Sequence, residues 1–288
     1  MPDPQPVFQL PDRSLTLLQI SDLHFGPPYL EHVGQAALQF AHQSSADAIV
    51  VSGDLTQRAR RSQFEAARAF LEQLPALPRI VIPGNHDVPL YRVVERFTHP
   101  HALYQELICS DLNPVLELPH AILLGIDSTT PRTAITNGRI TRSQLEHCRN
   151  VFSSAPPDKM RIVIAHHPFA AAPDVLRDQQ MQKARRAMEC FVELNVELIL
   201  GGHLHRAYIG SSLDFYPNLV DDRGIMIVQS GTTTSLRGRG REKEKNTLNQ
   251  VEISPTSICI THFMYVDQSD RFEPISQHCF RRRHAPLT

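Results

Sequence analysis

The chain has 288 residues, with 29 Lys and Arg against 30 Asp and Glu, and 41% of its residues are hydrophobic. This composition excludes a disordered chain, and the near-zero net charge argues against a protein that wraps nucleic acid. No apolar run is long enough to span a bilayer, and the N-terminal residues lack a signal-peptide pattern, so we expect a cytoplasmic protein without a transmembrane segment. The five cysteines are scattered and form no CxxC pair, which argues against a disulfide framework or a thiolate zinc site.

Short apolar runs rich in Ile, Leu and Val predict a series of buried strands. These runs are residues 15–20, 48–51, 79–82, 121–126, 161–165, 197–200 and 225–228. Helical patterns lie between them, and two capping-box patterns, Ser-x-x-Glu at 62–65 and Thr-x-x-Gln at 141–144, predict where two helices begin. Residues 247–254 and 257–266 follow as two strands joined by a turn at Pro255, so this end of the sheet should be antiparallel.

These elements predict an α/β sandwich with the sheets in the centre and the helices outside. The spacing of the first three strands suits βαβ units with right-handed crossovers. We expect a lead-in over residues 1–14, one domain over 15–266 and a solvated C-terminal tail over 267–288. One domain is favoured over two because the residues that carry chemistry span most of the chain.

Polar residues follow five of the predicted strands directly. They are Asp22 and His24, Asp54, Asn85-His86-Asp87, His166-His167, and His203 and His205. In α/β sheets ligands bind beyond the carboxyl ends of the strands, so these side chains should gather on one rim. Asp22 and His24 are two residues apart, as are His203 and His205. In extended backbone this i, i+2 spacing would point both side chains of a pair the same way. Two carboxylates, an amide and several imidazoles suit Mn²⁺, Fe or Zn²⁺ better than Ca²⁺.

In this order, the motifs Asp-x-His, Gly-Asp, Gly-Asn-His-Asp, His-His-Pro and Gly-His-x-His resemble those of the calcineurin-like metallophosphoesterases. The resemblance implies a four-layer αββα sandwich with a dinuclear metal site at the carboxyl ends of the strands. The cofactors would be two divalent metal ions, drawn from Mn²⁺, Fe²⁺/Fe³⁺ and Zn²⁺. One metal would be held by Asp22, His24, Asp54 and His205. The other would be held by Asp54, Asn85, His166 and His203, with Asp54 as the bridge.

The same resemblance implies roles for residues beside the metals. His86 would be a catalytic residue next to the scissile phosphate, donating to one of its oxygens. Asp87 would orient His86 or cap the segment that follows. His167 is expected near the site rather than on a metal, because His166 takes the ligand position.

Residues 19–25, 49–57 and 81–87 look most like the bacterial class III 3′,5′-cyclic-nucleotide phosphodiesterases. This resemblance implies a phosphodiester hydrolase in which a metal-bridging hydroxide attacks a small phosphodiester such as a 3′,5′-cyclic nucleotide. One alternative is a UDP-2,3-diacylglucosamine pyrophosphohydrolase of lipid A synthesis, which needs an apolar groove in residues 88–119, where we see no clean apolar stripe. A DNA-repair nuclease is disfavoured by the neutral charge, and a non-catalytic metal-binding scaffold is disfavoured by the complete ligand set.

Three segments could build the substrate pocket. Residues 206–224 leave the Gly-His-x-His motif directly, so they begin at the rim of the site. Residues 88–119 could form a lid or pack at the periphery. Residues 231–246 carry Arg237, Arg239 and Arg241 in a Gly-rich stretch, which could be a flexible clamp for an anionic substrate or a solvated charge run. An exposed edge of the terminal strands could support a homodimer.

Overall fold

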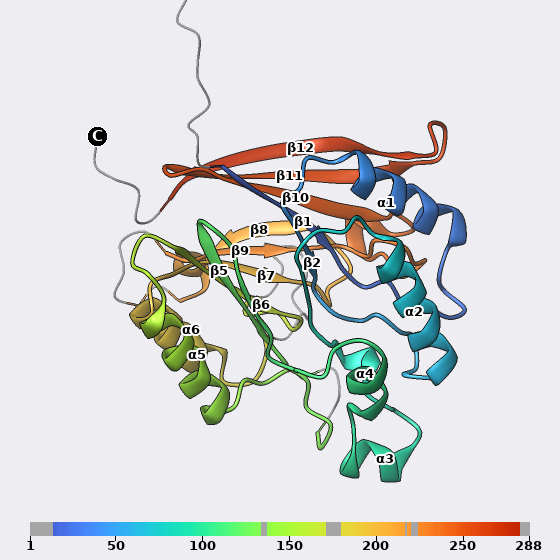
Figure 1. Cartoon of the computed structure of the whole chain (residues 1–288), viewed down its shortest axis with the longest axis horizontal. Helices are drawn as coiled ribbons and strands as arrows, with labels where there is room; N and C mark the ends of the chain where they lie inside the picture. Colours follow the sequence, from blue (N-terminus) through green and yellow to red (C-terminus); the bar gives the residue numbers. More distant parts are fainter. Residues whose placement is uncertain (1–13, 134–136, 171–179, 217, 220–223, 283–288) are drawn as a thin grey trace, which may run out of the picture.

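The computed structural model describes residues 14–133, 137–170, 180–216, 218–219 and 224–282. Two six-stranded mixed sheets pack face to face, and helices cover their outer faces (Figure 1). The strands of the first sheet, in spatial order, are β12 (Arg271–Arg281), β11 (Ser257–Val266), β10 (Thr247–Ile253), β1 (Leu15–Ile20), β2 (Ala48–Val51) and β3 (Arg79–Val81). Those of the second are β4 (Val115–Glu117), β5 (Ala121–Ile126), β6 (Met160–Ala165), β7 (Val196–Gly201), β9 (Met226–Gln229) and β8 (Tyr208–Ser211).

Helices α1 (Glu31–Gln43) and α2 (Arg61–Gln73) lie on the first sheet, and α5 (Arg142–Ser154) and α6 (Ala184–Glu193) lie on the second (Figure 1). The other helices are short: α3 (Val93–Thr98), α4 (Ala102–Leu107), α7 (Ser212–Phe215) and the 3₁₀ turns η1 (Asn85–Asp87) and η2 (Gly240–Glu242). One apolar core fills the space between the sheets. Two more lie outside it, one between each sheet and the helices that cover it. The predicted four-layer αββα sandwich is therefore confirmed.

The strands that lead to the polar residues run parallel to one another within each sheet. β1, β2 and β3 pair in parallel, as do β5, β6, β7 and β9. Their residues are nearly all buried because each sheet is covered on both faces, which explains why their sequences are continuous apolar runs. The carboxyl ends of these strands bring the polar residues to one edge of the sandwich.

The C-terminal part differs from the prediction. β10 and β11 are antiparallel as expected, but β12 pairs with β11 over residues 271–281, inside the segment predicted to be a solvated tail. This pairing places Cys259 opposite Cys279, and the two form a disulfide bond. The prediction of no disulfides was therefore wrong at this pair: without β12, nothing in the sequence placed the two cysteines side by side.

The capping predictions had mixed outcomes. Thr141 caps α5 as predicted, its side chain accepting from the N–H of Gln144. α2 begins at Arg61, before the predicted Ser62 cap. The side-chain oxygen of Gln63 accepts from the N–H groups of Arg58 and Arg60 instead. This amide therefore provides the acceptor for two backbone donors in the turn that precedes the helix.

Candidate metal centre

The loops after β1 and β2 run side by side and fix the first site residues. The N–H of Asp22 donates to Gly53 O, and the N–H of His24 donates to Asp54 O, both at 3.0 Å. Residues 232–235 also hold the loop that follows β1, because Thr232 Oγ1 donates to the carbonyl of Asp22 at 2.7 Å. The first residues of segment 231–246 are therefore buried scaffold rather than a flexible clamp.

Five of the predicted ligands have left-handed backbone conformations. Their φ angles are +54° at Asp22, +52° at His24, +53° at Asp54, +72° at His203 and +55° at His205. Such angles cost a non-glycine residue about 1–3 kcal/mol and gather at functional sites. Asp22 and His24 thus converge through two left-handed residues, and not through the extended backbone expected from their i, i+2 spacing.

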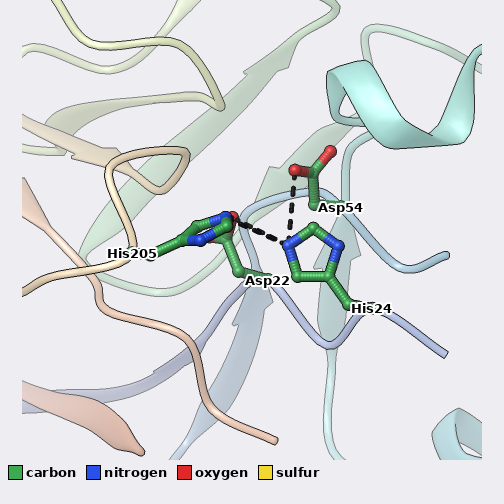
Figure 2. A group of neighbouring side chains, drawn as sticks. All are labelled: Asp22, His24, Asp54 and His205. Atoms are coloured by element: carbon green, nitrogen blue, oxygen red, sulfur yellow. Dashed lines mark hydrogen bonds and ion pairs between the residues drawn. The ribbon is translucent and has the colours of Figure 1, made fainter. Parts of the chain in front are cut away.

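One group of side chains brings four ligand atoms within 4.8 Å of one another, and all four residues are buried. Figure 2 shows Asp22, His24, Asp54 and His205 pointing toward a common centre. His205 Nε2 lies 3.0 Å from both His24 Nε2 and Asp22 Oδ1, and His24 Nε2 lies 3.7 Å from Asp54 Oδ2. This is the first predicted ligand set.

A second group adjoins the first through Asp54. Asp54 Oδ2 lies 3.3 Å from His166 Nε2, and Asn85 Oδ1 lies 3.2 Å from the same nitrogen and 2.8 Å from His203 Nδ1. His203 and His205 therefore turn to different groups although they are two residues apart. Asp54 lies between the groups, where a bridging carboxylate is required.

Outer hydrogen bonds orient the imidazoles. His166 Nδ1 donates to Ser52 O, and His205 Nδ1 donates to Arg237 O, each at 2.8 Å. Each bond leaves Nε2 as the nitrogen that faces the site, which is how metal-binding histidines are commonly held. Arg237 could not be linked to His205 from the sequence, because it lies far along the chain in a loop.

The 3₁₀ turn η1 places His86 beside the metal group. The His86 N–H donates to Asp54 Oδ1 at 2.8 Å, and its ring packs edge-to-face on His24 with centroids 4.8 Å apart. His86 Nδ1 donates to the carbonyl of Gln57 at 2.9 Å. This carbonyl, and not the Asp87 carboxylate, accepts the hydrogen bond from the ring.

The Asp87 carboxylate ties two loops together. Oδ2 accepts from the N–H groups of Gly84 and Leu55 at 2.9 and 3.0 Å. Oδ1 accepts from the N–H and hydroxyl of Thr56 at 2.8 and 2.9 Å. Asp87 thus positions the turn that carries Asp54 and caps its own turn; these four donors belong neither to the His86 ring nor to the segment that follows, where its bonds were expected.

Two glycines make room for the ligands. Gly53 has a φ of +99°, which suits a residue without a side chain. A Cβ at Gly84 would lie only 2.2 Å from Asp54 Oδ1, so no other residue fits this turn without moving the carboxylate.

The electrostatics favour a bound cation. Burial raises the pKa of Asp22, but the charges of the neighbouring histidines, His205 foremost, outweigh burial and hold the pKa well below the usual range. Burial lowers the pKa of His24 to about 4 and that of His203 well below its usual value. Burial also disfavours a charge on His166, yet the nearby Asp54 charge raises its pKa to about 9. The proton on His166 therefore balances the negative charge of Asp54, which a bound metal ion could balance instead.

The other expected residues lie as follows. His167 is buried, with Nδ1 within 2.8 Å of Ser128 Oγ and its ring against His203, which agrees with a place beside the ligands.

Segment 88–119 forms α3 and α4. On it, Tyr91, Val94 and Phe97 are exposed, in contrast to the absence of an apolar stripe expected from the sequence.

A match to known proteins agrees with this geometry. Residues 15–207 match the family model described as calcineurin-like phosphoesterase. The chain belongs to the calcineurin-like phosphoesterase family. It is a hydrolase that acts on phosphoesters.

One relative of this chain is a protein from a Synechococcus species that is named probable cyclic nucleotide phosphodiesterase. It is 28% identical over 211 residues, covering 68% of this chain and 75% of the relative. A protein of the same name from Psychrobacter arcticus is 26% identical over 225 residues, with the same coverage.

Two solved structures share the fold. A purple acid phosphatase from yellow lupin has a TM-score of 0.69 at 10% identity and covers 94% of this chain and 54% of that one. A dimetal phosphatase from Danio rerio has a TM-score of 0.61 at 12% identity and covers 93% of this chain and 98% of that one. No helix in the described part of this chain is both long and apolar enough to cross a membrane.

The residues of this phosphoesterase fit a divalent metal. Asp22 Oδ1 and Asp54 Oδ2 are buried and accept no hydrogen bond in the described part of the chain. An unsatisfied buried carboxylate oxygen is costly unless it binds a cation or a donor. Both oxygens lie beside histidine Nε2 atoms, which is the mixed O/N donor set that suits transition metals.

Proposed function

We propose that this protein is a dinuclear-metal phosphodiesterase of small phosphodiesters, such as a 3′,5′-cyclic nucleotide. The observation that carries the dinuclear assignment is the position of Asp54 Oδ2, which adjoins both histidine groups, 3.7 Å from His24 Nε2 and 3.3 Å from His166 Nε2. Asp22, His24, Asp54 and His205 would hold one Mn²⁺, Fe or Zn²⁺ ion. Asp54, Asn85, His166 and His203 would hold the other. The names of the Synechococcus and Psychrobacter relatives support a cyclic nucleotide as substrate.

When bound, such metals polarise the phosphoryl group and make hydroxide available near neutral pH. The chain supplies the remaining groups. Gln57 O fixes the Nδ1–H tautomer of His86, so Nε2 is the atom that can hold a proton for the leaving oxygen. Burial lowers the pKa of His86, and the negative charge of a bound phosphoryl group would oppose that shift.

The His86→Ala variant tests this role. We expect kcat for a phosphodiester to fall by about a hundredfold, because a positioned general acid is typically worth that much. The metal content, measured by elemental analysis, should not change, since no ligand is removed. Unchanged turnover would remove His86 from the mechanism.

The function is tested with bis-p-nitrophenyl phosphate and p-nitrophenyl phosphate, first on metal-stripped protein and then after Mn²⁺ is added. Metal-dependent cleavage of the diester, with little cleavage of the monoester, supports the proposal and makes cyclic AMP the next substrate. Preference for the monoester would contradict it. A site that binds two equivalents of metal but cleaves neither compound would also count against it.

One observation favours a second candidate, hydrolysis of a lipid-linked substrate such as UDP-2,3-diacylglucosamine. Tyr91, Val93 and Val94 are 74%, 58% and 78% exposed at the start of α3, which follows the turn that carries His86. Exposed apolar side chains there could receive acyl chains. Cleavage of a diacylated nucleotide-sugar but not of bis-p-nitrophenyl phosphate would select this candidate.

A further inference from the structure

Arg237 connects the two sides of the site. Its carbonyl accepts the hydrogen bond from His205 Nδ1 at 2.8 Å, and its Nη1 donates to Gln57 Oε1 at 3.1 Å. The carbonyl of Gln57 in turn holds the His86 ring. The main chain of Arg237 thus contacts a predicted metal ligand, and its guanidinium contacts the residue whose carbonyl holds the predicted acid.

Among the residues that the structure describes, the Arg237 guanidinium makes no ion pair with a carboxylate. Other arginines of the chain bind carboxylates, as Arg92 binds Glu95 and Arg282 binds Glu197, each at less than 3 Å. The side-chain hydrogen bond of Arg237 goes to a neutral amide, and its Nε is covered and makes no hydrogen bond in the described part of the chain.

The surroundings of Arg237 are those of an anion site. It is half-buried, so its charge is poorly screened by water. Burial lowers the pKa of Arg237, and the charges of Arg239 and Arg58 lower it too, while the charges of Asp54 and Asp22 oppose this shift. Two divalent cations would more than cancel these two carboxylates, and the centre would then carry excess positive charge.

We propose that Arg237 is a catalytic residue whose guanidinium binds a non-bridging oxygen of the substrate phosphoryl group, with Gln57 holding it in place. This proposal rests on the proposed function. Negative charge on the phosphoryl oxygens must be stabilised as the bond to the leaving group breaks, and a fixed, desolvated guanidinium stabilises it more than water does. Arg237 neither forms nor breaks a covalent bond.

The test compares Arg237→Met with Arg239→Met. Both changes remove one positive charge and keep a similar apolar stem, and Arg239 is exposed on the same loop. In Arg237→Met we expect kcat/KM for bis-p-nitrophenyl phosphate to fall by about a hundredfold, with unchanged metal content. Arg239→Met should stay within about twofold of the wild type, because an exposed charge is screened. Equal losses in both variants would overturn the proposal.

Orthophosphate binding supplies a readout that does not depend on turnover. By calorimetry on the metal-loaded proteins, Arg237→Met should bind orthophosphate at least tenfold more weakly than the wild type. This result would support Arg237 even if the wild type cleaved no diester, in which case only the proposed function would fail. Equal orthophosphate binding by the two proteins, or none by the wild type, would overturn the proposal.

The position of the guanidinium is tested separately with Gln57→Ala, which keeps the main-chain carbonyl that holds His86. We expect a smaller loss of kcat/KM than in Arg237→Met, and no further loss when the two changes are combined. Additive losses would show that Gln57 acts independently of Arg237.

Discussion

The Asp87→Asn substitution probes the loops that hold the metal centre. The two side chains have nearly the same shape, but the amide nitrogen donates where a carboxylate oxygen accepts. Each Asp87 oxygen accepts two hydrogen bonds, from Leu55 and Gly84 on one side and from the N–H and hydroxyl of Thr56 on the other. An amide nitrogen on the side of Leu55 and Gly84 leaves two N–H groups without an acceptor, whereas on the side of Thr56 it leaves one, because the hydroxyl can donate to the His86 carbonyl at 3.1 Å instead.

The expected cost follows from this count. Asp87 is 1% exposed, so water cannot replace the lost acceptor. A buried donor without a partner costs about 1–3 kcal/mol, and since at least one is created, the free energy of unfolding should fall by at least about that much. That is a large part of the stability of an ordinary domain.

Urea unfolding of the metal-free protein at pH 8 measures this loss. Burial and the charge of Asp54 raise the pKa of Asp87 to about 7, so at pH 8 the wild-type side chain is mostly ionised and carries a desolvation cost that the amide avoids; the lost hydrogen bonds must outweigh this relief for stability to fall. Asp47→Asn is the control, because Asp47 is exposed and accepts a single hydrogen bond from Thr16. A loss in Asp87→Asn no larger than in this control would refute the reasoning.

Three further predictions concern the site, the pH response and the disulfide. Gly84→Ala should abolish metal binding, measured by elemental analysis, because its Cβ would lie 2.2 Å from Asp54 Oδ1. Burial lowers the pKa of His262 to about 4 in the folded state, so the unfolded chain takes up this proton first as the pH falls from about 6.5 to 4; up to about 3 kcal/mol of stability should be lost through this group, and the slope should fall by up to about 1.4 kcal/mol per pH unit in His262→Gln. The unreduced, denatured protein should show three free thiols in a thiol titration, rather than five, because Cys259 and Cys279 are paired.

Much of the fold follows from the sequence because both sheets are covered on both sides. Strands such as β5 and β7 have no exposed residue, so their sequences are uninterrupted apolar runs that can be recognised without the structure. β12 has the opposite character. It is an edge strand whose residues are mostly exposed and polar, and it also contains Pro274 beside a bulge, so its sequence resembles a solvated tail.

The candidate ligands could also be anticipated, because each follows directly on a buried strand. The residues that orient them could not. Gln57 acts through its main-chain carbonyl, which has no sequence signature, and Arg237 reaches Gln57 across 180 positions of the chain. Only the tertiary structure brings these distant residues into contact, whereas a residue at the end of a strand is placed by the strand itself.

The backbone of the ligand loops indicates what these loops are for. Five candidate ligands have positive φ angles, and glycine at any of them would relieve strain while removing a donor atom. Within the described residues, two carboxylate oxygens are buried there without a hydrogen-bond donor. Both features lower the stability of the metal-free chain, and both are offset when a cation binds the same atoms. The geometry of these loops is therefore better explained by ligand binding than by folding.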